Sequence, residues 1–302
     1  MKELKAIPAI LAMALLALLP LPVARALGRW LGRRIYRKGE PHPMYRITRI
    51  NLEICFPQLS VTEREQLICE SLEQTGCSLA EMGLSWFWSP QRVLKQVRAV
   101  EGEALIRNEL EAGRGILLIA PHLGNWEVMN LYLSHHYPLT AMYKPPKLKL
   151  MDRLIRKRRA RLGSAMAPAD MKGVRMVLKA LKGAGIVGIL PDQEPDRSSG
   201  VFAPFYGEPA LTMKLLPQLA AQTQVKVLCG YARRLPEGGF SLHFSEAEPG
   251  IHSRDLQQSA AAMNASIERC VNQCPAQYQW EYKRFNTPAN GGPRRRYALK
   301  RD

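Results

Sequence analysis

A short apolar run that ends in a turn and resumes as a helix constrains the fold of this chain most strongly. Residues 115–120 have the length and composition of a buried strand. Pro121 and Gly124 interrupt that strand, and Asn125 is a favourable N-cap for a helix beginning at Trp126. The pattern predicts a strand, a turn and a helix in succession.

Two residues of this unit are candidates for catalysis. His122 lies in the turn, and Glu127 follows in the first turn of the predicted helix. Because the histidine precedes the helix, its side chain can fold back and meet the carboxylate. A neutral imidazole oriented by a carboxylate removes a proton from a hydroxyl near pH 7. The pair predicts general-base catalysis with a substrate hydroxyl as nucleophile; alternatively, His122 is a turn residue and Glu127 an acid favoured by the helix dipole.

The charge of the chain predicts an anionic partner. Among 302 residues, 43 are Lys or Arg and 26 are Asp or Glu, which gives a formal net charge of +17. A phospholipid surface, a phosphorylated substrate, an acidic carrier protein or nucleic acid would each fit this charge. The sequence contains no zinc-finger spacing, RNA-recognition aromatic motif or basic region leading into heptads, so a nucleic acid partner is disfavoured.

The cysteines and histidines do not form a recognisable metal site. The six cysteines contain no CxxC pair, and we expect reduced thiols that serve in packing. A metallohydrolase site using His122, His135 and His136 is a further alternative, but the sequence lacks HExxH and a second carboxylate cluster. We therefore expect neither a metal nor another cofactor.

The N-terminus predicts a membrane anchor over residues 1–24. Residues 6–24 carry no charge and are long enough to enter a hydrocarbon core of about 30 Å. A cleaved signal peptide is the alternative, with Lys2 and Lys5 as its basic start and residues 24–26 as a small-x-small cleavage site, which Arg25 makes a poor one.

Residues 25–43 predict a basic interfacial helix. Arg25, Arg29, Arg33 and Arg37 recur every four residues and so share one helical face, as in helices held at anionic headgroups. An ordinary solvated charged face is the alternative. The positive-inside rule would keep this flank, and the domain after it, in the cytoplasm.

The remaining chain predicts an α/β domain over residues 44–288, with a mixed central sheet covered by helices. Helical spacing dominates from residue 44 to about 110, and one of these helices begins at a cap formed by Ser60 or Thr62. Strand-like runs then alternate with helical stretches. These runs cover residues 115–120, 139–143, 185–190, 225–232 and 240–244. Residues 289–302 form a basic tail that we expect to be flexible.

The order of several motifs resembles the lysophospholipid acyltransferase-like superfamily, and within it the lipid A biosynthesis acyltransferases. The resemblance covers most of the chain. It rests on residues 51–60 (NLEICFPQLS), the His-x4-Glu motif at His122, an Arg-rich helix ending at residues 159–163 (RARLG), and residues 190–193 (LPDQ), 200–207 (GVFAPFYG) and 280–285 (WEYKRF).

The resemblance implies acyl transfer from acyl carrier protein to a hydroxyl of a lipid A precursor, at the cytoplasmic face of the inner membrane. His122 would be the base and Glu127 its orienting partner. An acceptor of another kind, a lysophospholipid or an aminolipid, is an alternative within the same fold. A non-catalytic membrane-surface binding protein is an alternative of another class. Acyl chain length and the acceptor hydroxyl do not follow from the sequence.

The resemblance also implies residues that bind the anionic substrate. An arginine of residues 159–161 would serve it, because guanidinium groups bind phosphate in a bidentate way. The sequence does not separate the two arginines. Residues 200–207 would line a pocket for the acyl chain or headgroup. Lys144 stands where relatives commonly have arginine, and it keeps the charge without the fork. The binding candidates are Arg159, Arg161, Asp192, Lys144 and Asn125, each of which could instead have a structural role.

Overall fold

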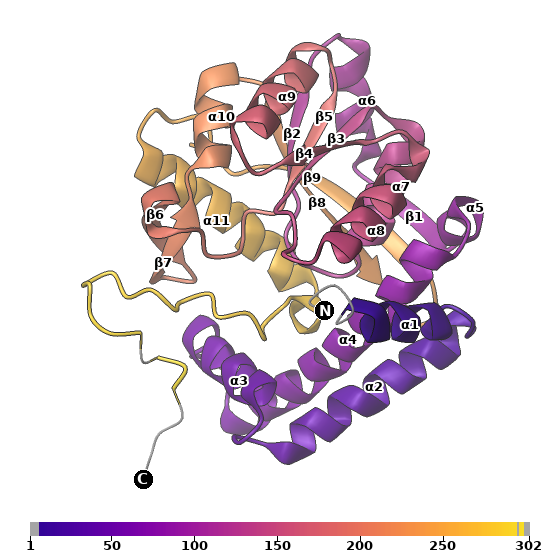
Figure 1. Cartoon of the computed structure of the whole chain (residues 1–302). Coiled ribbons are helices and arrows are strands. Elements are labelled where there is room, and N and C mark those ends of the chain that lie inside the picture. Colours follow the sequence, from indigo (N-terminus) through magenta and orange to yellow (C-terminus); the bar gives the residue numbers. More distant parts are fainter. Residues whose placement is uncertain (1–5, 295, 299–302) are drawn as a thin grey trace.

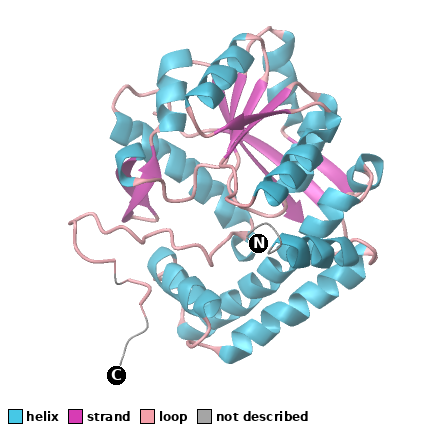
Figure 2. Cartoon of the chain, viewed as in Figure 1, coloured by secondary structure: helices cyan, strands magenta, loops and turns pink. Residues whose placement is uncertain are grey.

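The computed structural model describes residues 6–294 and 296–298. A layer of N-terminal helices lies against an α/β domain (Figure 1 and Figure 2). The layer contains α1 (Ile7–Leu16), α2 (Leu21–Lys38), α3 (Pro43–Cys55) and α4 (Val61–Phe87), and α4 packs against the other three.

Seven strands form the central sheet, in the order β1-β9-β8-β2-β5-β3-β4. Neighbouring strands are parallel except β8 and β9, which form an antiparallel hairpin. The strands are β1 (Val97–Glu101), β2 (Ile116–Ile119), β3 (Leu139–Tyr143), β4 (Ala165–Pro168), β5 (Ile186–Ile189), β8 (Lys226–Arg234) and β9 (Phe240–Glu246). The prediction of a mixed sheet is confirmed, as are its five strands, whereas the short edge strands β1 and β4 were not predicted.

Helices cover both faces of the sheet. The central strand β2 is buried along its whole length, and its alternate residues belong to two different cores. Leu117 and Ile119 pack in one core with residues of α9, α10 and α11, while Ile116 and Leu118 pack in the other with residues of α6 and α7. The helices of this domain are α5 (Pro90–Leu94), α6 (Glu103–Glu111), α7 (Trp126–His136), α8 (Lys149–Arg159), α9 (Met171–Lys182), α10 (Leu215–Thr223) and α11 (Leu256–Gln273).

The long helix α4 begins where the sequence predicts. Ser60 and Glu63 form a capping box, in which the Glu63 backbone N–H donates to the Ser60 hydroxyl and the Ser60 N–H donates to Glu63. Further along, α4 and α2 approach so closely that a Cβ on Gly28 would lie 2.6 Å from the Gly76 carbonyl carbon. Glycine is required there because the two backbones touch.

The N-terminal apolar run does not form one long helix. It breaks between α1 and α2, near Pro20, and α2 crosses the expected boundary at residue 24. The 10 residues of α1 span only about 15 Å, half of a hydrocarbon core. In the part of the chain that the structure describes, no helix has the length and hydropathy needed to cross a membrane. Lys2 and Lys5 lie outside the described residues.

The four arginines on one face of α2 differ in exposure: Arg25 is buried, whereas Arg33 and Arg37 are exposed. Arg25 is buried against Glu81 of α4, and Arg33 forms an ion pair of 2.6 Å with Glu73 of the same helix. The prediction that these arginines face lipid headgroups is therefore wrong for Arg25, which is buried against a carboxylate on α4. It stays a prediction for Arg33, whose side chain is 56% exposed. The surface of α2 also exposes apolar residues, including Val23 and Trp30.

The segment after α11 is a strap between the helical layer and the α/β domain. Within the stretch expected to be a flexible tail, Tyr297 is buried, and its hydroxyl donates to Asn51 of α3 over 2.5 Å. The same hydroxyl accepts from the backbone N–H of Phe285. Packing of the Tyr297 ring contradicts a fully mobile tail; residues 295 and 299–302 lie outside the described residues.

Candidate active site

The turn after β2 is held by backbone contacts. The Gly124 N–H donates to Gln277, and the Asn125 N–H donates to Ala232 of β8 over 2.8 Å. Gly124 has a φ of +63°, and a Cβ there would lie 1.9 Å from the Ala232 oxygen. The Asn125 side chain accepts from the backbone N–H of Val128 and caps α7, as the sequence predicts.

The carboxylate on the imidazole of His122 is Asp192. His122 Nδ1 lies 2.8 Å from Asp192 Oδ1, and the backbone N–H of His122 donates to Oδ2 over 2.8 Å. Each residue follows its strand by three positions, and Ile119 at the end of β2 pairs with Ile189 at the end of β5. The strand register therefore brings the two side chains together at the carboxyl edge of the sheet, where open α/β folds bind their ligands.

The surroundings favour an ionised Asp192. Burial alone would raise the pKa of its carboxyl, but the charge of a protonated His122 and the hydrogen bonds from His122 outweigh burial and lower that pKa. The imidazole remains accessible, because 14% of the His122 side chain is exposed against 2% for Asp192. An ionised carboxylate on Nδ1 fixes the tautomer and stabilises an imidazolium.

The other ring nitrogen of His122 faces polar side chains. Gln193 Nε2 lies 3.4 Å from His122 Nε2 and 3.3 Å from Gln279 Oε1. The Trp126 ring makes an edge contact with the imidazole, with ring centroids 5.1 Å apart. Sequence reasoning did not identify Gln193 or Gln279, although Gln193 directly follows Asp192 in the quoted motif.

Glu127 faces a different partner from the one expected. Its carboxylate accepts from Arg159 Nε at 3.0 and 3.1 Å, and it also contacts Arg159 Nη2. Burial opposes the charge of Arg159, but the attraction of Glu127 outweighs it and raises the pKa of the guanidinium. The expected contact between Glu127 and His122 is thus replaced by two separate pairs, because Asp192 occupies Nδ1 and the end of α8 brings Arg159 to Glu127.

The two candidate arginines have different surroundings. Arg161 donates to the backbone carbonyls of Ser85, Trp86 and Trp88 at 2.7–3.1 Å. These carbonyls belong to the last turn of α4 and its C-cap, where a cation is favourable. Arg159 instead lies beside the catalytic candidates through Glu127, so the geometry favours Arg159 as the functional arginine.

The remaining binding candidates are divided between surface and core. Lys144 is exposed and directly follows β3, at the same carboxyl edge as His122. Asn125 is only 5% exposed, and its amide donates to Glu81 over 3.0 Å, so both ends of the side chain are used internally. A contact between Asn125 and substrate is not supported by this placement.

Residues 200–207 form the first strand and the turn of a hairpin, and their role in lining a pocket stays a prediction. Strands β6 (Gly200–Phe205) and β7 (Glu208–Met213) pair antiparallel, and Phe205 is fully buried in the core. A small apolar cavity of about 40 Å³ lies elsewhere, between α7 and strands β2, β3 and β5, with Trp126, Gly188 and Arg159 in its lining. It begins beside the catalytic candidates.

Sequence reasoning also missed Glu281, a buried acid in the segment after α11. Glu281 accepts from the Thr75 hydroxyl over 3.0 Å. Burial raises the pKa of the Glu281 carboxyl, although hydrogen bonds and the nearby charge of His122 act in the opposite direction. Its place in the quoted WEYKRF motif was the only signal available in the sequence.

A metal site built from three histidines is contradicted by the fold. His122 precedes α7, whereas His135 and His136 are its last two residues, so about 15 Å of helix separates them. Among the residues that the structure describes, no group of three or more His, Cys, Asp or Glu side chains is arranged to hold a metal ion.

Comparison with known proteins identifies the family. A model of the bacterial lipid A biosynthesis acyltransferases matches residues 6–287. The lipid A biosynthesis lauroyltransferase of Escherichia coli K12 is 32% identical over 279 residues, which cover 92% of this chain and 90% of the relative. The palmitoleoyltransferase of the same strain is 32% identical over 264 residues, covering 85% and 84%, and its myristoyltransferase is 23% identical over 279 residues, covering 89% and 82%. The chain therefore belongs to the bacterial lipid A biosynthesis acyltransferase family and is an acyltransferase.

Proposed function

We propose that the protein transfers a fatty acyl chain from the thioester of acyl carrier protein to a hydroxyl of a lipid A precursor, with His122 as general base. The observation that carries the proposal is the contact of His122 Nδ1 with the buried Asp192 at the carboxyl edge of the sheet. An imidazole held in this way presents the Nε2 lone pair to a hydroxyl. Family membership supplies the acyl-transfer chemistry.

The proposed reaction needs only groups of the chain and its two substrates. His122 Nε2 takes the proton of the acceptor hydroxyl while the oxygen attacks the thioester carbonyl carbon. The tetrahedral intermediate collapses with formation of the ester and breakage of the carbon–sulfur bond. The departing thiolate then takes the proton from the imidazolium, and His122 returns to its neutral form. The acceptor hydroxyl takes the place of the Gln193 amide near Nε2.

Glu127 would act through Arg159. A guanidinium held by a carboxylate along one edge keeps its direction and retains further N–H donors. We propose that Glu127 aims Arg159 at an anionic oxygen of a substrate, and that Arg159, not Arg161, is the substrate-binding arginine. Lys144, on the same edge of the sheet, would add positive charge to this binding surface.

The positive charge of the chain fits both proposed substrates. Acyl carrier protein is acidic, and a lipid A precursor is an anionic glycolipid. The last turn of α8, which ends at Arg159, carries Arg156, Lys157 and Arg158. This basic helix borders the proposed active site and is our candidate for the first contact with an acidic carrier.

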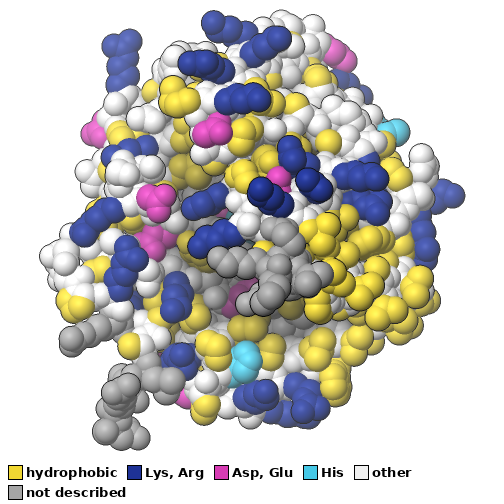
Figure 3. Space-filling model, viewed as in Figure 1, with side chains coloured by type: hydrophobic (Ala, Val, Ile, Leu, Met, Phe, Trp, Pro, Cys, Tyr) yellow, Lys and Arg dark blue, Asp and Glu magenta, His cyan; other side chains and the backbone are white. Residues whose placement is uncertain are grey.

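We propose that α1 and α2 rest on the cytoplasmic face of the inner membrane. Figure 3 shows hydrophobic side chains gathered where Figure 1 places α1, with Lys and Arg side chains beside them. Leu11, Leu15 and Leu18 are exposed along α1 and the turn after it, and Trp30 is exposed on α2 with Arg34 against its ring. An apolar surface bordered by cations is typical of segments that lie in the membrane interface.

The test of the proposal is the His122→Ala enzyme. We expect kcat to fall by about 10²- to 10⁴-fold, the range of general-base catalysis, in an assay with lauroyl-acyl carrier protein and a purified lipid A precursor. His243→Ala is the matched control, because His243 also contacts a carboxylate through Nδ1, that of Glu101 on edge strand β1, and β8 lies between its own strand β9 and β2. It should remain active.

Two results would contradict the proposal. A folded His122→Ala enzyme with full activity would exclude the proposed base. Mass spectrometry of the products must also show one added acyl chain on the lipid A precursor. Acylation of a lysophospholipid or an aminolipid alone would assign another acceptor to the same fold.

A further inference from the structure

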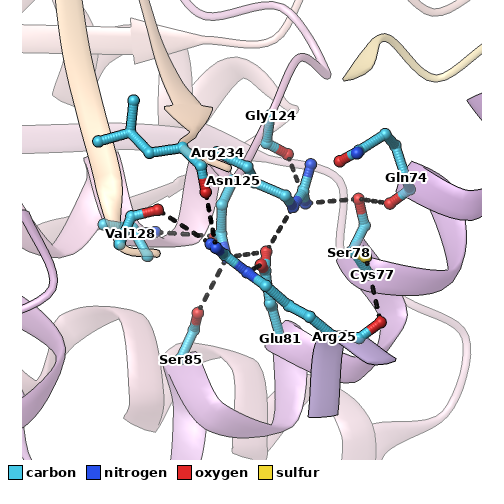
Figure 4. A network of polar contacts seen from close by, with 12 residues as sticks. Arg25, Gln74, Cys77, Ser78, Glu81, Ser85, Gly124, Asn125, Val128 and Arg234 are labelled. Atoms are coloured by element: carbon cyan, nitrogen blue, oxygen red, sulfur yellow. Dashed lines mark hydrogen bonds and ion pairs between the residues drawn. The ribbon is translucent and has the colours of Figure 1, made fainter. Parts of the chain in front are cut away.

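A buried cluster of three charges lies directly behind the proposed catalytic turn (Figure 4). Glu81 of α4 contacts Arg25 of α2 at 2.6 Å and Arg234 of β8 at 2.7 Å. All three side chains are at least 93% buried. Such a cluster is expensive to desolvate, and removal of one member leaves the others uncompensated.

The cluster is connected to the turn by two hydrogen bonds. Glu81 Oε2 accepts from the Asn125 amide over 3.0 Å, while the other end of that amide caps α7. Arg234 Nη2 donates to the Gly124 carbonyl at 3.1 Å. The strand that carries Arg234 also holds the turn through its backbone, because the Asn125 N–H donates to the carbonyl of Ala232. Gly124 and Asn125, which lie between His122 and α7, are thus both held by hydrogen bonds from this cluster.

Arg25 connects this cluster to α2, the helix on which it lies. Its Nη2 and Nη1 donate to the carbonyls of Gly239 and Leu235, at 3.0 and 3.2 Å, in the turn between β8 and β9. The guanidinium also stacks on Phe240, with 4.9 Å to the ring centroid. Arg25 therefore fixes α2 to the sheet and to Glu81 at once.

We infer that Glu81 is a positioning residue for the acyl-transfer reaction, which it serves by holding the Gly124–Asn125 turn so that His122 and Glu127 keep their relative placement. This inference rests on the proposed function. Glu81 touches no proposed substrate group, so its effect must pass through the turn. Arg25 makes helix α2 part of that support, which gives the N-terminal layer a role in the chemistry.

The test compares two ion pairs between the same helices. Glu81→Gln keeps the shape of the side chain and removes its charge, whereas Glu73→Gln does the same to the more exposed pair with Arg33. In the full-chain enzyme with lauroyl-acyl carrier protein and a lipid A precursor, Glu81→Gln should lower kcat by about 100-fold, because a misplacement of about 1 Å costs that much. KM for the acyl donor should change less than twofold, and Glu73→Gln should leave both constants within twofold of the parent enzyme.

A second variant keeps the inference falsifiable if Glu81→Gln folds poorly. Asn125→Ser retains a good helix cap but is too short to reach Glu81, and it should lower kcat to a similar extent. When both single variants fold, the double variant should be no worse than the poorer single one, because both break one connection.

The outcomes separate this inference from the proposed function. The inference is overturned if Glu81→Gln retains full kcat, or if its loss of kcat only follows the folded fraction measured by circular dichroism. It is also overturned if the losses of kcat caused by Glu81→Gln and Asn125→Ser multiply in the double variant. If His122→Ala were inactive and Glu81→Gln fully active, His122 would remain the proposed base, and the positioning role of Glu81 would be excluded. A fully active His122→Ala enzyme would overturn both.

Discussion

The loop after β5 and the contact between α7 and α8 each place a buried acid at the same edge of the sheet, with different partners. Asp192 in the loop binds the imidazole and backbone N–H of His122, while Glu127 on α7 binds the guanidinium of Arg159. In the proposed mechanism, one acid serves a group that changes protonation and the other serves a fixed cation. The contact with His122 that was expected of Glu127 is made by Asp192, and Glu127 contacts Arg159 instead.

The difference shows that strand register was a better guide than sequence spacing. His122 and Glu127 are close in sequence, but α7 carries Glu127 round towards α8. His122 and Asp192 are far apart in sequence, yet they leave adjacent parallel strands at equivalent positions. Groups that leave the carboxyl ends of neighbouring parallel strands converge, whatever their separation along the chain.

The largest expected effect is that of Asp192→Asn. Loss of the charge removes the stabilisation of the imidazolium and allows the wrong tautomer of His122. The corresponding change in carboxylate–imidazole pairs of hydrolases costs about 10⁴ in kcat, and we expect a loss of about 10³- to 10⁴-fold here. Steady-state kinetics with saturating donor and acceptor measure it.

Glu101→Gln is the control for this substitution. Glu101 also accepts from a histidine Nδ1, that of His243, but it is exposed and lies on edge strand β1. The Glu101→Gln enzyme should have the same kcat as the parent enzyme. If instead Asp192→Asn were fully active and Glu127→Gln inactive, the comparison would be reversed, and Glu127 would be the acid that serves the base.

A smaller effect should separate the two arginines. Arg159→Lys keeps the positive charge but loses the planar fork, so we expect KM for the lipid A precursor to rise about tenfold, with a smaller change in kcat. Arg161→Lys removes contacts with the C-terminal carbonyls of α4. It should lower the free energy of unfolding by about 1–3 kcal/mol, with KM unchanged in the folded enzyme.

This result can also break the assignment. A raised KM in Arg161→Lys with a normal KM in Arg159→Lys would make Arg161 the substrate-binding arginine. The pair of variants is matched, because both replace a partly buried arginine by lysine, one at the last residue of α8 and one two residues later. Chemical denaturation and kinetics together distinguish a lost helix cap from a lost substrate contact.

The sequence predicts the centre of the fold better than its connections. The strand at residues 115–120 and the Asn125 cap follow from local patterns, because a buried run and a helix N-terminus have local causes. The partner of His122 depends on strand order, which no local pattern specifies. Arg25 was taken for a headgroup contact because periodicity identifies the face of a helix but not its neighbour. In the structure Arg25 contacts the carboxylate of Glu81.

The smallest expected effect concerns the pH dependence of stability at Glu281, the acid near His122 on the strap. Burial raises the pKa of its carboxyl above the ordinary value of 4.5. The folded protein therefore binds this proton more tightly than the unfolded chain does, and stability declines as pH rises from about 4.5 through the raised pKa. The side chain introduced by Glu281→Gln does not titrate in this range. The Tm of this variant minus the Tm of the parent should therefore increase between pH 5 and pH 8.

The exposed Glu237 supplies the control, since Glu237→Gln should give a Tm difference that stays constant over the same range. A constant difference for Glu281→Gln as well would mean that Glu281 is ionised throughout this range in the folded protein. The charge of an ionised Glu281 would then act on the imidazole together with that of Asp192. The distinction between one acid that serves His122 and one that serves Arg159 would no longer describe the whole site.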